Sequence, residues 1–215
     1  MLVAQDRILL DRLQQARAQT DKLFDIVRPD SLYDRPIAER HRIVFYIGHL
    51  EAFDWNLLRS ETNLQPFDAE LDKLFAFGID PVDGGLPSDQ PSDWPALEQV
   101  KRYRARIREE LDAVLDRVPE ALLNTAIEHR LMHAETLAYM LHRLPLEKKI
   151  RQRQADVPER SQPRPESIEI PEGFVRLGLS RDASDFGWDN EYESHTVNVP
   201  AFAIDRYKVT NGQYL

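Results

Sequence analysis

The sequence contains no cysteine and no excess of positive charge. Without cysteine, disulfide bridges, thiolate metal sites and a cysteine nucleophile are excluded, and the composition is compatible with the cytosol, which we expect to be its compartment. The 28 Lys and Arg residues stand against 37 Asp and Glu, a formal net charge of −9. Because phosphate recognition requires a concentrated basic surface, we expect neither nucleic acid nor a membrane as a partner.

Long uninterrupted apolar runs are also missing. Charged residues interrupt the first thirteen positions, so this stretch is typical neither of a signal peptide nor of a membrane span. What the chain does have is 42% hydrophobic residues spread over 215 positions. This hydrophobic content can build a core, and the length of 215 residues predicts one complete domain and part of another.

Apolar residues recur at spacings of three and four in several segments, which is the period of amphipathic helices. Prolines near the ends of these segments support the boundaries. The pattern predicts four long helices and one shorter one, over residues 2–27, 37–61, 95–117, 119–144 and 68–77. The fold class that follows is mainly α, with an antiparallel four-helix bundle over residues 1–145.

The composition changes after residue 145. Residues 146–171 combine Lys and Arg with four prolines and few large apolar side chains, which predicts a linker. Beyond it the hydrophobic period becomes two, and short strands are predicted over residues 174–179, 196–199 and 201–205. So few strands can hardly bury a core of their own. We therefore expect residues 172–215 to be the truncated beginning of a second domain.

Two histidines, His129 and His133, lie four residues apart in the last predicted long helix, so they share one face. His49 lies among apolar residues in an earlier helix and is the natural third donor from a facing helix. Three neutral imidazoles are a complete ligand set for a divalent cation with open coordination positions. A shared cation would satisfy ring nitrogens brought into an apolar interior. From the spacing alone, a coincidence or a pair of histidines satisfied inside the core is more common than a pair of ligands, and the apolar surroundings are what favour the metal site.

Four further residues lie close to these histidines in the sequence. Glu135 projects about 200° around the helix from His133, so we expect an outer-shell partner rather than a ligand. We expect Met132, Tyr46 and Phe53 to line a pocket or to support the imidazoles. Gly48, next to His49, permits the close approach of a neighbour or a ligand.

Several segments together resemble one family, and they occur in the family's order. They are Ile47-Gly48-His49, Trp55-Asn56-Leu57-Leu58, Leu71-Asp72-Lys73-Leu74-Phe75, the His-x-x-x-His-x-Glu pattern from His129 to Glu135, Phe186-Gly187-Trp188-Asp189-Asn190-Glu191 and Val209-Thr210-Asn211. In these segments the chain resembles the EgtB-type sulfoxide synthases of ergothioneine biosynthesis, including the selenoneine synthase branch. Such proteins combine a DinB-like helical bundle with a sulfatase-modifying-factor domain, an α+β, C-type-lectin-like fold related to the formylglycine-generating enzyme.

The resemblance implies an activity and a metal. It makes His49, His129 and His133 the ligands of one Fe(2+). It implies a non-heme iron oxidoreductase that uses O2 to join a low-molecular-weight thiol, or a selenosugar, to C2 of the trimethylhistidine imidazole. It also implies that the proton-donating groups lie in a part of the second domain beyond this chain, so no catalytic residue is assigned.

Two departures from the family pattern bear on the substrate. Met132 occupies a position that is often polar in relatives. The loop over residues 78–93 contains four Asp and no Lys or Arg. This acidic loop predicts a donor without carboxylates, such as a sugar, because a carboxylated thiol would be repelled.

Two other functions are compatible with the same residues. One is a DinB-like thiol S-transferase that uses zinc or nickel and no oxygen chemistry. The other is a truncated, non-catalytic remnant. The Phe186–Glu191 segment favours the synthase over the transferase, because a simple transferase has no need of it.

Overall fold

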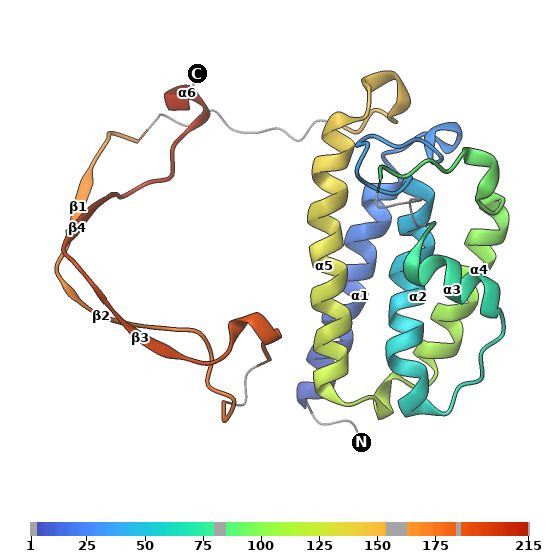
Figure 1. The fold of residues 1–215 in the computed structure, drawn as a ribbon, viewed down its shortest axis with the longest axis horizontal. Coiled ribbons are helices and arrows are strands. Elements are labelled where there is room, and N and C mark those ends of the chain that lie inside the picture. The colour runs from blue at the N-terminus through green and yellow to red at the C-terminus, as the bar shows by residue number, and fades with distance from the viewer. Residues whose placement is uncertain (1–3, 80–84, 154–162, 184–185, 215) are drawn as a thin grey trace. The chain divides into compact units, whose positions relative to one another are not determined.

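The computed structural model describes residues 4–79, 85–153, 163–183 and 186–214, which form two compact units, Met1–Gln152 and Arg153–Leu215. The first unit is a helical bundle (Figure 1). Its long helices are α1 (Ala4–Phe24), α2 (Ile43–Thr62), α4 (Leu97–Asp112) and α5 (Glu120–Arg143), and the short helix α3 (Ala69–Phe77) packs on α2. The predicted mainly α bundle is confirmed. None of the described helices combines the length and the apolar character needed to cross a bilayer.

The four long helices form two parallel pairs that run in opposite directions (Figure 1). The ends of α1 and α5 lie together, because Val27 forms a β-bridge with Lys149 just beyond the two helices. The starts of α2 and α4 also lie together, since the Tyr33 hydroxyl donates to the Pro95 carbonyl over 2.8 Å. Residues 63–79 and 85–96, the described part of the connection that contains α3, lie between the end of α2 and the start of α4. The helix directions therefore do not simply alternate along the sequence.

Two helix boundaries differ from the sequence-based expectation. The second helix begins at Ile43 rather than at residue 37, because Arg42 has an extended backbone and its side chain binds Asp89. The third long helix ends at Asp112. A single 3-10 turn over Leu115–Arg117 continues to bury apolar side chains there, so the apolar spacing runs past the end of the α-helix. Other single 3-10 turns cover Pro29–Ser31, Pro91–Asp93, Leu146–Lys148 and Asp189–Glu191.

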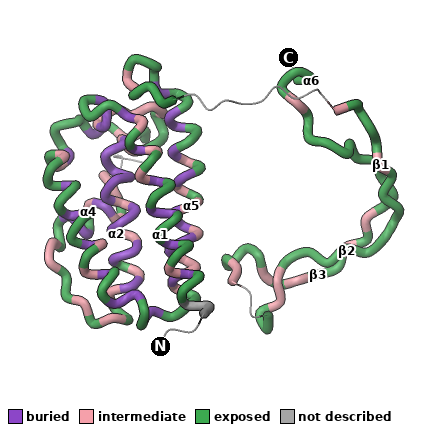
Figure 2. Tube along the Cα trace, turned by 180° about the vertical axis from the view of Figure 1, so that it is seen from behind, coloured by how far each residue is buried: buried purple, intermediate pink, exposed green. Residues whose placement is uncertain are grey.

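Helix α2 is the centre of the core. It packs against α3, α4 and α5 and is buried along most of its length (Figure 2). A Cβ atom on Gly48 would lie 2.3 Å from the ring of Phe75. Glycine at this position therefore allows α3 to lie directly on α2, as the close approach predicted from the sequence requires.

The second unit contains two antiparallel ribbons. Strand β1 (Ser167–Ile170) pairs with β4 (Phe202–Asp205), and β2 (Gly173–Leu177) pairs with β3 (His195–Val199). The short helix α6 (Asn211–Tyr214) follows β4. None of the described residues of this unit is buried.

The predicted linker over residues 146–171 was wrong at both ends. At its start, the Ile150 amide donates to the Ile26 carbonyl over 2.7 Å, which ties this segment to the bundle unit. At its end, Ser167–Ile170 forms strand β1. Residues 154–162, the middle of the predicted linker, lie outside the described residues.

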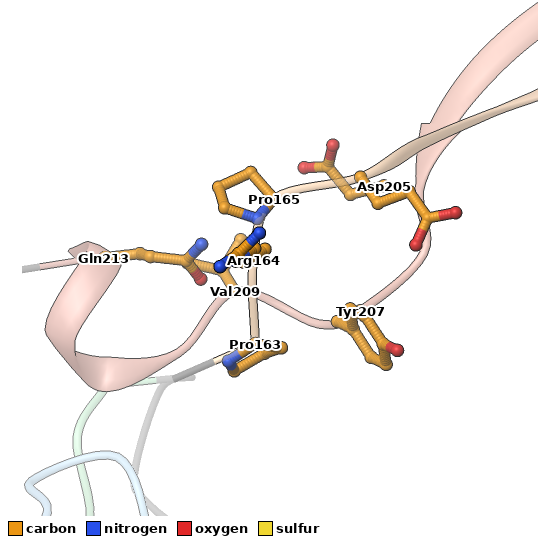
Figure 3. Close-up of a pocket in the computed structure, with 8 residues that line it drawn as sticks. Pro163, Arg164, Pro165, Asp205, Tyr207, Val209 and Gln213 are labelled. Carbon is orange, nitrogen blue, oxygen red and sulfur yellow. The ribbon is translucent and has the colours of Figure 1, made fainter. Parts of the chain in front are cut away.

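A hollow of about 230 Å³ lies at one end of the β1–β4 ribbon. Figure 3 shows Asp205 and Tyr207 on one side of it and Gln213 on the other. Tyr207 is 51% exposed, and no residue that lines the hollow is buried. Its surroundings therefore lack the enclosed, desolvated character of a binding site.

Candidate metal centre

The three predicted histidines converge inside the bundle. Nε2 of His133 lies 3.1 Å from Nε2 of His49 and 3.1 Å from Nε2 of His129. One ligand atom from each of the three rings lies within 4.8 Å of the others. Two imidazole nitrogens bound to one metal at about 2.1 Å and at a right angle to each other are about 3.0 Å apart. The spacing of these nitrogens thus fits a shared cation.

The orientation of His49 is set by α3. Its Nδ1 lies 2.7 Å from the carbonyl oxygen of Phe75. A carbonyl only accepts hydrogen bonds, so Nδ1 is the donor and carries the proton, and the lone pair is on Nε2. A hydrogen bond of this kind holds a ligating imidazole in the tautomer and direction that a metal needs.

Aromatic side chains surround the other two histidines. The ring of Phe53 stacks on His129, with centroids 3.4 Å apart and an interplanar angle of 9°. The ring of Tyr46 lies 5.6 Å from that of His133. The Nδ1 atoms of His129 and His133 are buried without a hydrogen-bond partner among the described residues. Tyr46 and Phe53, which the sequence placed near the site, thus contact the imidazoles.

Burial keeps all three rings neutral. It lowers the pKa of His129 to about 2 and that of His133 to about 3, and the charge that would develop on neighbouring imidazoles acts in the same direction. Burial also lowers the pKa of His49. Neutral imidazole is the form that binds a cation, so the rings are ready for a metal near pH 7. Imidazole ligands suit iron, zinc, copper and nickel, and the donor set alone does not choose among them.

The other two residues that the sequence placed near the site lie on the surface of the bundle unit. Met132 is 51% exposed, although it lies between His129 and His133 in α5. Glu135 is exposed and forms no hydrogen bond or ion pair with the residues that the structure describes. The expected outer-shell role of Glu135 is therefore absent from the described bundle, because its position on α5 turns the side chain away from the imidazoles.

A buried ion network lies directly beside the histidines, and it was not predicted from the sequence. Arg130 is completely buried and donates to Glu51 over 3.0 Å and to Asp54 over 2.6 Å. Arg108 of α4 binds the same Glu51 over 2.6 Å and both carboxylate oxygens of Asp21 of α1. Burial disfavours the charge on Glu51, but the two arginines outweigh it and lower the pKa to about 2. All four long helices are joined through this network.

The only sequence signal for this network is that charged residues occupy positions on the apolar faces of two helices. Glu51 and Asp54 stand three residues apart in the most apolar of the long helices, and Arg130 interrupts the seam next to His129. Carboxylates and an arginine at such positions require partners when they are buried. Which partners they meet depends on how the helices pack.

Two family models match the chain. The DinB superfamily model matches residues 12–147, and the model of the sulfatase-modifying factor enzyme 1-like domain matches residues 153–215. The chain is similar to "Ergothioneine biosynthesis protein 1" of Neurospora crassa, with 30% identity over 217 residues, which cover 86% of this chain and 24% of that protein.

Two further relatives have related names. "Ergothioneine biosynthesis protein 1" of Schizosaccharomyces pombe is 26% identical over 241 residues, covering 91% of this chain and 30% of that protein. "Hercynine oxygenase" of Mycolicibacterium thermoresistibile is 31% identical over 120 residues, covering 54% of this chain and 27% of that protein. The chain thus spans less than a third of the length of these curated relatives.

Proposed function

The chain belongs to the DinB superfamily and, through its second matched domain and its relatives, to the EgtB-type family, and we propose that it provides the metal centre of an O2-dependent sulfoxide synthase. The substrates of the proposed reaction are trimethylhistidine, which is hercynine, and a low-molecular-weight thiol or selenol. The observation that carries the proposal is the convergence of His49, His129 and His133 as three neutral imidazoles.

The proposed reaction balances without an external reductant. A C–S bond forms at C2 of the imidazole, while the C2–H and S–H bonds break. One oxygen atom of O2 enters the sulfoxide, and the other leaves as water with the two hydrogens. Sulfur and C2 together supply the four electrons that reduce O2. For a selenol donor the same C–H and Se–H bonds are lost.

The described residues would hold and shield the reacting centre. His49, His129 and His133 would hold iron(II), and bound iron(II) supplies the activation of O2. Three neutral ligands leave the positive charge of the cation available to favour a thiolate over a thiol. Phe53 and Tyr46 would exclude water from one side of the imidazoles, because their rings pack against His129 and His133. The Phe75 carbonyl would hold the His49 ring in place.

Elemental analysis of anaerobically purified protein tests the metal assignment. We expect about one iron per chain in the wild type and a substoichiometric amount in each of His49→Ala, His129→Ala and His133→Ala, since each change removes one of three ligands. His142→Ala is the matched control, because His142 is an exposed histidine of the same helix α5. Equal metal content in all five proteins would refute the site.

Oxygen consumption tests the reaction. With the full-length, iron-loaded protein, we expect uptake that requires both trimethylhistidine and a thiol or selenol. Oxygen uptake that proceeds without trimethylhistidine, or without the thiol or selenol, argues against the synthase. A protein that binds zinc or nickel at the same histidines and transfers a thiol without consuming O2 would instead be a DinB-like thiol S-transferase.

A further inference from the structure

A cavity of about 650 Å³ lies between α2 and α3 and reaches His49. Along α2 its wall includes His49, Phe53 and Arg59. Along α3 the wall includes Lys73 and Phe77. The cavity therefore begins at the candidate metal centre, has aromatic side chains near it, and carries two cationic groups.

The two cationic groups, Arg59 and Lys73, form no ion pair among the described residues. The Nε atom of Arg59 is buried without a hydrogen-bond partner in the described part of the chain. The acidic residue of the wall, Asp72, is only 7% exposed. Its carboxylate already accepts hydrogen bonds from Trp55 Nε1 over 3.2 Å and from the Tyr103 hydroxyl over 2.7 Å. The wall thus carries two cationic groups against one carboxylate that is already hydrogen-bonded, and its balance of charge is positive.

One of the four aspartates of the acidic loop over residues 78–93 is neutralised inside the bundle unit. Asp89 is buried and bound by Arg35, Arg42 and the indole of Trp94. Asp93 accepts a hydrogen bond from the Gln90 amide over 2.6 Å. Asp80 and Asp83 lie outside the described residues. The sequence predicted repulsion of a carboxylated donor from a count of four Asp in this loop. Asp89 does not contribute to that repulsion, because two guanidinium groups neutralise its charge.

We propose that Arg59 and Lys73 form an anion-binding subsite for the carboxylate of an elongated sulfur or selenium donor. This inference rests on the proposed function, because the reactive end of the donor is placed at the histidines. Arg59 lies ten residues beyond His49 on α2, about 15 Å along the helix axis. Lys73 lies closer, because it is two residues before Phe75, whose carbonyl binds His49. A donor that reaches Arg59 therefore carries its carboxylate several bonds away from the sulfur.

The apolar part of the cavity suits the middle of such a molecule. Phe53 offers ring surface between His49 and Arg59 along α2, and Phe77 lines the same cavity from α3. Burying the methylene groups of an extended donor there adds to the affinity, because their apolar surface is removed from water. A carboxylate, an apolar chain and a thiol in that order would match the cavity from Arg59 to His49.

Isothermal titration calorimetry with matched thiols tests the subsite. The probes are 6-mercaptohexanoate, its neutral counterpart 6-mercaptohexan-1-ol and the short acid 3-mercaptopropionate. We expect 6-mercaptohexanoate to bind about tenfold more tightly than either of the other two, because a charge-assisted hydrogen bond contributes about 1.5 kcal/mol or more. Equal affinity for the acid and the alcohol, or no binding of 6-mercaptohexanoate, would overturn the subsite. Equally tight binding of the short acid would overturn the elongated donor.

Variants assign the effect to the two residues. We expect Arg59→Gln to weaken binding of 6-mercaptohexanoate about tenfold and Lys73→Gln about threefold, since Lys73 is exposed and its charge is screened. Neither change should alter binding of the alcohol. Lys22→Gln is the control, because Lys22 is an exposed residue of α1 away from the cavity. A double variant of Arg59 and Lys73 that binds the acid like the wild type would disprove the assignment.

A thiol-free probe separates this inference from the metal assignment. In the His129→Ala variant, 6-hydroxyhexanoate should still bind more tightly than hexane-1,6-diol, and Arg59→Gln should abolish the difference. If the wild type binds no metal but this difference persists, the subsite stands and the synthase fails. If metal binds and the difference is absent, the subsite fails and the synthase stands.

Discussion

The main-chain oxygen of Phe75 accepts a 2.7 Å hydrogen bond from His49, and the Phe75 ring fills the space above Gly48. One residue of α3 thus orients a candidate metal ligand and also occupies the gap left by the glycine beside it. The packing of α3 on α2 and the geometry of the candidate metal centre are therefore coupled.

Gly48→Ala tests this coupling. The added Cβ would lie 2.3 Å from the Phe75 ring, so α3 has to shift. We expect a loss of about 1 to 3 kcal/mol in the free energy of unfolding, which is typical of overpacking. We also expect weaker metal binding, because the Phe75 carbonyl moves with α3. Urea denaturation and metal titration measure the two effects.

Gly173→Ala is the matched control for this change. Gly173 begins strand β2, and nothing lies within 4 Å of the position of its added Cβ. We expect neither stability nor metal affinity to change. If Gly48→Ala behaved like this control, the close packing of α3 would not matter to the site.

Arg130→Met tests the buried ion network. The change leaves the carboxylates of Glu51 and Asp54 without their shared partner, and both are almost completely buried. Removing one member of a buried ion pair costs about 3 to 5 kcal/mol. We expect a loss of this size in the free energy of unfolding, measured by chemical denaturation of the metal-free protein.

Lys101→Met provides the comparison for a surface pair. Lys101 binds Glu98 over 2.9 Å, but both side chains are more than half exposed. Such pairs contribute at most about 1 kcal/mol. A cost for Arg130→Met no larger than that for Lys101→Met would show that the network contributes nothing special to the bundle.

The stability of the metal-free protein should depend on pH through the buried histidines. Their pKa values are lowered in the folded state, to about 2 for His129 and about 3 for His133. Below the ordinary histidine pKa of about 6.5, the unfolded chain therefore binds protons that the folded chain does not. The free energy of unfolding should fall as the pH decreases from 6.5 to 5, by up to about 1.4 kcal/mol per pH unit for each histidine.

His129→Gln isolates one part of this dependence. Glutamine does not titrate, so the slope between pH 6.5 and 5 should be smaller by up to about 1.4 kcal/mol per pH unit. Chemical denaturation at several pH values gives the slope. An unchanged slope in the variant would mean that His129 is protonated equally in both states and is not buried as described.

The local parts of the site could be predicted from the sequence, whereas the long-range parts could not. The shared face of His129 and His133 follows from helix geometry alone. His49 could be added because its neighbours mark an apolar interior. Arg59 and Lys73 gave no such signal, because their shared cavity exists only where α3 lies on α2. That contact depends on Gly48 and Phe75 meeting across the fold.

The same distinction explains the errors in the fold. The helices were predicted because a period of three and four is a local property. Residues 146–150 resemble a linker in composition, but their backbone groups pair with the end of α1. Strand β1 is four residues long, and its partner β4 is more than thirty residues further along the chain. Composition does not reveal such distant partners.

His129 and Arg130 are consecutive residues of α5, so their side chains leave the helix about 100° apart. One points to the imidazole of His133, and the other reaches the carboxylates of Glu51 and Asp54 on α2. A roll of α5 about its own axis would pull both groups out of place at once. The histidine cluster and the buried ion pairs thus both depend on the rotation of α5 about its axis. A redesigned bundle would have to preserve one rotation that satisfies the imidazoles and the carboxylates at the same time.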